Sequence, residues 1–287
     1  MIMDELNKSD FSLIVFDLDD TLTESKSSLD PEMAELLGAL LKIKLVAVTS
    51  GASLAQFQQQ FLAQLAKVTP NLENLYLLPT SGASLYVYQT ATKDWQAVYH
   101  EELSTEDKEK IKSALIKVFI ESEFSSGELS QSDKEKIKST IAQVLIKTEF
   151  SSQAGDYGQI LEDRDSQITF SALGQTAPIG LKISWDPGQQ KRREIADGLQ
   201  KLLPEFLVKI GGSTSIDITK RGIDKAYGLR RLTNYLKLSL DQVLYVGDAL
   251  FPGGNDEPLL GLGVTCQSVD SITATKDLIR QLIANTG

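Results

Sequence analysis

Four consecutive apolar residues, Leu13-Ile14-Val15-Phe16, run directly into the acidic segment Asp17-Leu18-Asp19-Asp20-Thr21. An uninterrupted apolar run is typical of a strand buried on both faces, as in the middle of a parallel sheet. Such a strand delivers the next residues to the carboxyl edge of the sheet, where open α/β folds bind ligands. Two carboxylates at positions i and i+2, followed by a hydroxyl, can hold Mg²⁺ and attack a phosphorus atom. The plain alternative is a strand-to-turn junction, since Asp and Thr are common in turns.

Apolar runs and amphipathic stretches alternate in two separate parts of the chain, residues 11–82 and 223–287. Each apolar run predicts a buried strand, and each amphipathic stretch predicts a helix. Asp30 followed by Pro31 is a typical helix start, with Asp30 as the N-cap. The predicted strands are 13–16, 45–48, 75–78 and 243–246, and the predicted helices are 31–41, 53–67, 224–237 and 272–283. This alternation predicts a parallel sheet covered by helices on both faces.

The middle of the chain follows a different pattern. Short, partly alternating runs at 85–88, 95–99, 168–170 and 215–219 predict an antiparallel sheet backed by helices. A chain of 287 residues also exceeds the usual size of one domain. We therefore expect an α/β fold whose core comprises residues 1–82 and 220–287, with an α+β cap domain inserted at 83–219.

One segment of the expected insert is duplicated. Asp107-Lys-Glu-Lys-Ile-Lys-Ser113 recurs as Asp133-Lys-Glu-Lys-Ile-Lys-Ser139, and Glu123-Phe-Ser-Ser126 recurs as Glu149-Phe-Ser-Ser152. Two copies are too few for a solenoid, which needs about three or more repeats. We interpret residues 104–152 as a tandem-duplicated helix with its exit loop. An altered cap surface or a subunit contact is the functional alternative.

Composition limits the partners of this chain. A net charge of −10 argues against nucleic acid or an anionic membrane as the main partner. Cys266 is the only cysteine, which excludes an intramolecular disulfide. No stretch approaches the length of a membrane span, and the N-terminus lacks a signal-peptide pattern, so we expect a cytoplasmic protein. An acidic protein that handles phosphate must concentrate positive charge locally, through a metal or a few Lys and Arg.

Further polar residues lie where predicted strands end or helices begin. Asp248 follows the strand at 243–246, where it is placed to share a cation with Asp17. Ser50 follows the strand at 45–48 and can bond a phosphate oxygen. Lys225 opens a predicted helix and can neutralise a transferring phosphoryl group. Taken singly, each has a plain alternative, because Gly-Asp pairs build turns and a lone lysine is usually solvated.

Taken in order, Asp17-x-Asp19-x-Thr21, Ser50, Lys225 and Gly247-Asp248 resemble the haloacid dehalogenase superfamily of phosphotransferases. Gly211-Gly-Ser-Thr-Ser-Ile-Asp217, Gly222-x-Asp224-Lys225 and Pro252-Gly-Gly-Asn-Asp256 resemble its eukaryotic-type phosphomannomutase branch. The similarity covers nearly all of both core segments and is weak across residues 90–160. It implies a Rossmann-like core with an inserted cap, Mg²⁺, and a phosphorylated small-molecule substrate, most simply a sugar phosphate. Relatives in this branch dimerise through their caps, which leaves a homodimer open.

The resemblance also implies a role for each matching residue. Asp17 is expected to be the nucleophile that forms an aspartyl-phosphate, and Asp19 the general acid and base. Mg²⁺ is expected to bind Asp17, the backbone carbonyl of Asp19, and Asp248, with Asp256 supporting the site. Ser50 and Lys225 are expected to stabilise the phosphoryl group. The residues expected to contact the substrate are Lys26, Gly51, Arg164, Ser215, Asp217 and Asn255.

A mutase must hold phosphate at either end of its substrate, and the relatives use cap arginines for the second site. Ser171 and Leu181 stand where two of those arginines would be, and Lys26 replaces another. Lysine lacks the bidentate fork of arginine. The other cap cations that we considered, and interpret as solvated surface charges, are Arg164, Lys182 and Arg192. We therefore expect a sugar-phosphate phosphatase, with a phosphomannomutase-like isomerase as the alternative and a non-catalytic binding module as a distant third.

Overall fold

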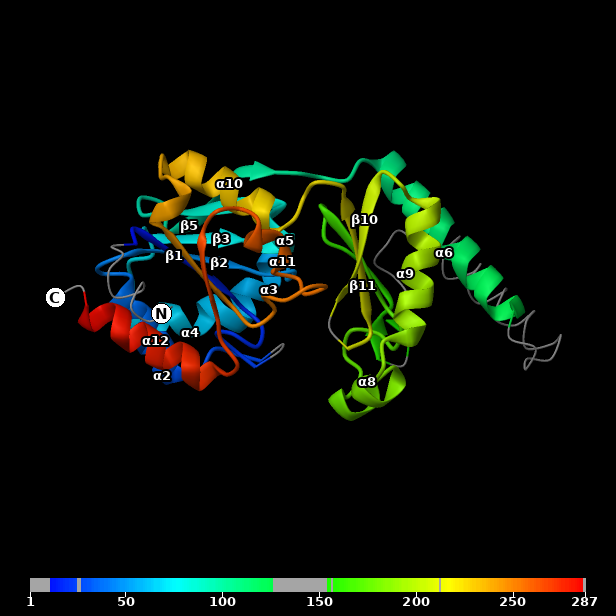
Figure 1. Ribbon diagram of the computed structural model, residues 1–287, viewed down its shortest axis with the longest axis horizontal. Coiled ribbons are helices and arrows are strands. Elements are labelled where there is room, and N and C mark those ends of the chain that lie inside the picture. Colours follow the sequence, from blue (N-terminus) through cyan, green and yellow to red (C-terminus); the bar gives the residue numbers. More distant parts are fainter. Residues whose placement is uncertain (1–10, 25–26, 126–153, 156, 212, 286–287) are drawn as a thin grey trace. The chain divides into compact units, whose positions relative to one another are not determined.

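The computed structural model describes residues 11–24, 27–125, 154–155, 157–211 and 213–285. Lys26 and the second copy of the duplicated segment lie outside the described residues. The chain forms two compact units, one of Met1–His100 with Ile223–Gly287 and the other of Glu101–Gly222 (Figure 1). None of the described helices has both the length and the apolar character needed to cross a membrane.

The first unit is built on a seven-stranded sheet with the order β13-β12-β1-β2-β3-β4-β5. The strands are β1 (Leu13–Asp17), β2 (Leu45–Thr49), β3 (Leu75–Leu78), β4 (Ser84–Gln89), β5 (Asp94–His100), β12 (Val243–Gly247) and β13 (Thr265–Ser268). The five strands from β13 to β3 are parallel, and β1 lies between β12 and β2. The predicted parallel sheet with β1 in its middle is therefore confirmed.

Helices cover both faces of this sheet, because the side chains of each strand alternate between two apolar clusters. Ile14 and Phe16 face one cluster, and Leu13 and Val15 face the other. In Figure 1, α10 lies over one face, and α2, α4 and α12 lie over the other. These helices are α2 (Pro31–Leu40), α4 (Ala63–Val68), α10 (Lys225–Leu236) and α12 (Ile272–Ala284). A strand buried on both faces must be apolar throughout, which explains the run that precedes Asp17.

Side-chain caps fix where the helices begin. The Asp30 carboxylate accepts hydrogen bonds from two backbone N–H groups at the start of α2, as expected for an N-cap. Asp224 caps α10 in the same way and leaves Lys225 as its first residue. The helix expected at 53–67 is divided by a π turn into α3 (Leu54–Phe57), η1 (Gln58–Leu62) and α4. Two short elements complete this unit, η2 (Leu240–Gln242) and α11 (Glu257–Leu260).

Strands β4 and β5 correct the expected domain boundary. Residues 85–88 and 95–99 were assigned to the insert, but both strands extend the core sheet as antiparallel neighbours of β3. The chain reverses after β3 in the short segment α5 (Pro79–Gly82), where Thr80, Ser81 and Gly82 all have positive φ. Alternating antiparallel strands have the same sequence pattern at a sheet edge as in a separate sheet, so the pattern alone could not place them. The insert consequently begins after His100.

The second unit holds a four-stranded antiparallel sheet with the order β10-β11-β9-β8. Its strands are β8 (Leu161–Asp163), β9 (Gln167–Ser171), β10 (Phe206–Gly211) and β11 (Ser215–Lys220), and its helices are α6 (Thr105–Ser125), α8 (Ile179–Trp185) and α9 (Gln190–Leu202). A short pair, β6 (Ala154–Gly155) and β7 (Gly158–Gln159), lies apart from this sheet. Residues 107–113 and 123–125 of the first copy lie in α6, where Ile111 is fully buried in the core that α6 shares with α9, β9 and β11.

Candidate active site

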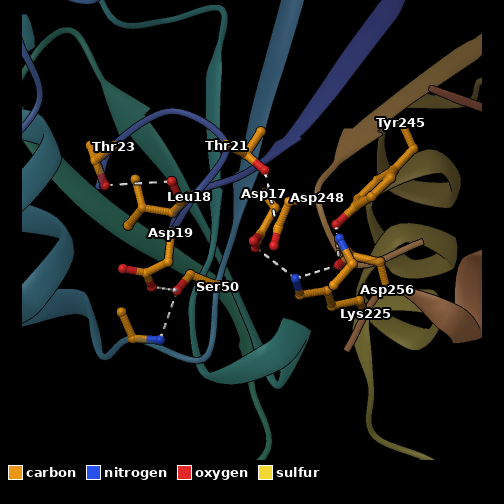
Figure 2. Close-up of polar contacts among 12 residues, drawn as sticks. Asp17, Leu18, Asp19, Thr21, Thr23, Ser50, Lys225, Tyr245, Asp248 and Asp256 are labelled. Carbon is orange, nitrogen blue, oxygen red and sulfur yellow. Dashed lines mark hydrogen bonds and ion pairs between the residues drawn. The ribbon is translucent and has the colours of Figure 1, made fainter. Parts of the chain in front are cut away.

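The predicted catalytic residues of the first unit gather at one edge of the parallel sheet. Asp17 ends β1, Ser50 follows β2, and Asp248 follows β12. These three strands are adjacent and parallel, so their carboxyl ends meet at the same edge. Lys225 reaches this edge from the first turn of α10, where the Asp224 N-cap fixes the start of the helix (Figure 2).

Lys225 lies between two carboxylates. Its Nζ atom donates to Asp17 Oδ1 at 2.6 Å and to Asp256 Oδ1 at 2.5 Å. All three side chains are removed from water, with relative exposures of 2% for Asp17, 3% for Lys225 and 0% for Asp256. Buried charges are retained only when they are paired, so this clamp holds Lys225 in one position against Asp17.

Burial and neighbouring charges shift the pKa values of these groups in a consistent direction. Burial raises the pKa of Asp17 to about 8; Lys225 opposes this rise, and the Asp256 carboxylate adds to it. Burial alone would lower the pKa of Lys225, but the carboxylates of Asp17 and Asp256 raise it above its ordinary value. The pKa of Asp248 is also raised, first by burial and then by Asp256. The cluster thus has more negative than positive charge and favours a bound cation.

Three carboxylates at this edge have the composition of a metal site. One oxygen from each of Asp17, Asp248 and Asp256 lies within 4.8 Å of the others. Thr21 Oγ1 donates to Asp248 Oδ1 at 3.4 Å and so helps to orient that carboxylate. Hard carboxylate oxygens are the donors that Mg²⁺ prefers, and it commonly takes one or two carboxylates together with waters. The residues present therefore fit Mg²⁺.

Asp19 and Ser50 form a second contact beside this cluster. Ser50 Oγ donates to Asp19 Oδ2 at 3.3 Å and accepts from the backbone N–H of Ala52 at 3.0 Å (Figure 2). Asp19 is only partly buried, unlike Asp17. The loop turns at Asp20, whose φ is 59° and whose N–H donates to the carbonyl of Thr23 at 2.7 Å. The turn directs Asp17 and Asp19 to different surroundings, which suits them to different chemical roles.

The chain reversal after β3 is hydrogen-bonded to the loop that carries Ser50. Thr80 N–H donates to the carbonyl of Ala52 at 2.9 Å, and Ser81 N–H donates to the carbonyl of Ser50 at 2.8 Å. Both donors lie in left-handed conformations, at φ values of 49° and 57°. Left-handed backbone costs about 1–2 kcal/mol per ordinary residue, so this turn is strained where it meets the loop.

Tyr245 is a residue of this site that the sequence analysis missed. Its hydroxyl, at the centre of β12, donates to Asp256 Oδ1 at 2.7 Å. A signal was present, because a tyrosine within an otherwise aliphatic buried strand needs a hydrogen-bond acceptor in the core.

The expected substrate contacts fall in both units. Gly51 and Asn255 lie in the loops that carry Ser50 and Asp256. Ser215 and Asp217 lie on β11, and Asp217 Oδ1 accepts from Thr169 Oγ1 at 2.8 Å. Arg164 lies in the second unit as well, and its role as a substrate ligand stays a prediction.

The fold and the acidic cluster define a phosphotransferase with an α/β core and an inserted cap. The family model of haloacid dehalogenase-like hydrolases matches residues 14–262, and the chain belongs to this family.

Two relatives with similar sequences are phosphomannomutases. Phosphomannomutase from Schizosaccharomyces pombe is 24% identical over 252 residues, which cover 85% of this chain and 83% of that protein. Phosphomannomutase from Spinacia oleracea is 25% identical over 274 residues, with 94% of this chain and 93% of that protein covered. Both sequence identities are low, and more than four-fifths of each relative is matched.

Solved structures support the fold. An N-terminally truncated IMP-nucleotidase from Plasmodium falciparum matches with a TM-score of 0.64 at 16% identity, covering 98% of this chain and 72% of that one. SMU.1108c from Streptococcus mutans UA159 matches with a TM-score of 0.57 at 18% identity, covering 96% of this chain and 99% of that one. At such identities the likeness concerns the fold alone.

Proposed function

We propose that this protein is a Mg²⁺-dependent phosphatase that hydrolyses a sugar phosphate through an aspartyl-phosphate on Asp17. Asp17 is buried at the end of β1 with Lys225 2.6 Å away, which aligns the carboxylate and balances its charge. Phosphoryl transfer depends on such positioning and neutralisation more than on elaborate covalent chemistry. The phosphoester bond breaks as a bond forms to Asp17, and water then releases inorganic phosphate.

The remaining residues divide the other tasks among them. Asp19 protonates the leaving oxygen and then deprotonates the attacking water, which its partly exposed position allows. Ser50 donates its single hydroxyl proton to Asp19 in the free protein, and turns it to a phosphate oxygen when the substrate is present. Asp17 and Asp248, with the backbone carbonyl of Asp19, would hold Mg²⁺, which would supply charge neutralisation at the transferring group. Asp256 supports this site through Lys225.

One observation favours a phosphatase over a mutase: the three cap cations considered in the sequence, Arg164, Lys182 and Arg192, have partners inside the second unit. Arg192 Nε donates to Asp186 Oδ2 at 2.9 Å, and Arg164 Nη2 donates to Glu162 Oε2 at 2.7 Å. Lys182 Nζ donates to the carbonyl of Gln175 at 2.7 Å. The interpretation of these cations as solvated surface charges is wrong, since each is largely buried.

These contacts weaken the case for a second phosphate site. A buried arginine that is neutralised by a carboxylate has little charge to offer a phosphate, and breaking such a pair is costly. Ser171, which stands at an arginine position of the relatives, is fully buried and shares a hydrogen bond with Thr214. Water is therefore the acceptor that fits this cap best.

A phosphomannomutase-like isomerase is the second candidate. It is favoured by the curated relatives, which are named phosphomannomutases and are matched over more than four-fifths of their length. Under either function we propose that Gly51, Asn255, Ser215 and Asp217 contact the substrate. Arg164, which is paired with Glu162, belongs to this proposal as a contact of the sugar and not of its phosphate. Lys26, which lies outside the described residues, belongs to the same proposal. We also propose a cytoplasmic location. A homodimer formed through the cap is one of the oligomeric states that the sequence leaves undecided.

A single assay separates the two candidates. The purified protein is incubated with Mg²⁺ and hexose 1- or 6-phosphates, with and without a trace of the hexose bisphosphate, while phosphate release and isomer content are measured together. We expect phosphate release that needs no bisphosphate and that EDTA abolishes. Isomer interconversion that depends on the bisphosphate, without phosphate release, would overturn the phosphatase in favour of the mutase. Asp17→Asn is the matched control, because it keeps the side-chain shape and removes the nucleophile.

A further inference from the structure

The hydroxyl of Tyr245 lies in the first unit's core, beneath the proposed reaction centre. Tyr245 is fully buried at the middle of β12, between Leu244 and Val246, which are also fully buried. Burial raises the pKa of this hydroxyl well above its ordinary value, and Asp256 adds to the effect. The group therefore stays protonated and acts only as a hydrogen-bond donor to the carboxylate.

Tyr245 is one of three donors that fix the Asp256 carboxylate. Asp256 Oδ1 accepts from Tyr245 Oη at 2.7 Å and from Lys225 Nζ at 2.5 Å. Asp256 Oδ2 accepts from the backbone N–H of Ala249 at 3.3 Å. Figure 2 shows the tyrosine ring and Lys225 both directed at this carboxylate. With each oxygen held by a donor, the carboxylate cannot turn without breaking a buried hydrogen bond, which is costly.

Gly247, two residues after Tyr245, leaves the space in which the Tyr245 ring and the Asp256 carboxylate meet. A Cβ atom on Gly247 would lie 2.3 Å from Asp256 Oδ2 and 2.9 Å from Cε1 of Tyr245. Only glycine therefore allows the carboxylate and the ring to approach each other here. The close approach is a second observation, independent of the hydrogen bond, that links Tyr245 to Asp256.

We propose that Tyr245 is a positioning residue for phosphoryl transfer. Its hydroxyl holds Asp256 Oδ1 in the orientation that directs Lys225 Nζ at Asp17, so that lysine and nucleophile are aligned before substrate binds. Tyr245 touches neither substrate nor the reacting atoms and acts only through Asp256 and Lys225. The proposal rests on the proposed function, because it assigns a role within that same site.

The test compares three single variants and one double variant in steady-state phosphate release with Mg²⁺ present. Tyr245→Phe removes only the hydroxyl and keeps the buried ring. Tyr76→Phe is the matched control, because Tyr76 lies on β3 of the same sheet, packs in the same apolar cluster and, among the hydrogen bonds of the described residues, has none to Asp256. Asp256→Ala, alone and combined with Tyr245→Phe, shows whether the tyrosine acts through the carboxylate.

We expect Tyr245→Phe to lower kcat about tenfold with KM changed less than about twofold, since a hydrogen bond to a charged group is lost while substrate contacts remain. Tyr76→Phe is expected to keep both constants. In the Asp256→Ala background, Tyr245→Phe is expected to have no further effect on kcat, because residues acting in series are non-additive. If Tyr245→Phe alone fails to fold, the comparison is made in the Asp256→Ala background only. In that background Tyr245→Phe leaves no buried carboxylate without a hydrogen-bond donor.

Two results would overturn the proposal. One is a folded Tyr245→Phe protein with an unchanged kcat, even if its unfolding midpoint falls, because that is the signature of a merely structural role. The other is an equal further loss of kcat in the Asp256→Ala background. Failure of the proposed function is recognised separately, because the unmodified protein would then release no phosphate.

Discussion

Replacing Lys225 by methionine tests whether the lysine is the charge that stabilises the buried acidic cluster. Methionine keeps an unbranched side chain of similar length and leaves the carboxylates of Asp17 and Asp256 facing each other without their shared donor. Both ion pairs are almost completely buried. Removing one partner of a buried pair costs about 3–5 kcal/mol, so Lys225→Met is expected to lower the free energy of unfolding of the first unit by that amount without metal.

The direction of the pH dependence also follows from the site. The pKa of Asp17 is raised to about 8 although Lys225 lowers it, so removing Lys225 raises it further. An acid whose folded pKa lies above its unfolded value holds its proton longer in the folded state, and stability falls as pH rises towards that folded pKa. Asp17 of the unmodified protein has lost its proton above pH 8, whereas the variant still holds it there. The difference in stability between the two proteins should therefore grow from about pH 7 to about pH 9.

The two tryptophans of the chain allow this measurement to be confined to one unit. Trp95 lies on β5 in the first unit and Trp185 ends α8 in the second, so a Trp185→Phe background reports on the first unit alone. Urea unfolding with EDTA is followed by fluorescence at both pH values. The matched control is Arg230→Met on the exposed side of α10, which should change stability by less than about 0.5 kcal/mol. A loss below about 1 kcal/mol, or one that shrinks as pH rises, would refute the reasoning.

Three further predictions follow from the same geometry. Asp248→Asn should weaken Mg²⁺ binding, measured by calorimetry on the metal-free protein, by about tenfold or more, because a carboxylate ligand is lost; unchanged affinity would remove Asp248 from the site. Ser50→Ala should lower kcat about tenfold through loss of the hydrogen bond that holds Asp19, and an unchanged kcat would contradict that role. Ser81→Asn should raise the urea midpoint reported by Trp95, since asparagine tolerates the left-handed φ of 57° at about 0.5 kcal/mol less strain; a lower midpoint would show that the serine hydroxyl matters more than the backbone.

The convergence of Asp17, Ser50 and Asp248 could be predicted because it depends only on strand direction. Each follows an apolar run, and parallel strands end at one edge. The start of α10 could also be predicted, because Asp224 is a favourable N-cap residue. What the sequence could not supply is the clamp on Lys225. The helix start is a local property, whereas the contact with Asp256 joins segments that are 31 residues apart.

Two predictions are wrong for specific physical reasons: the placement of β4 and β5 in the insert, and the exposure of Arg192. Strands β4 and β5 were placed in the insert because an edge hairpin alternates in the same way as a separate antiparallel sheet. Arg192 is predicted to be solvated because charged residues are mostly exposed. In the structure the carboxylate of Asp186, six positions earlier, accepts hydrogen bonds from the Arg192 side chain and from two backbone N–H groups of α9. Both features depend on which partner the chain meets in space, and single-residue tendencies do not contain that information.

The electrostatics of the site couple its two expected ligands to each other. The cluster of Asp17, Asp248 and Asp256 carries more negative charge than Lys225 balances, in a protein whose net charge is −10. A phosphate monoester adds further negative charge and is repelled by such a cluster, whereas a divalent cation is attracted to it. A cation bound at the carboxylates removes the repulsion, and a phosphate oxygen beside it gives the cation another ligand. Each ligand therefore raises the affinity for the other, and by linkage the two effects must be equal. An acidic protein could bind a phosphate monoester at this edge if most of the balancing positive charge arrived with the metal, in addition to the charge of Lys225.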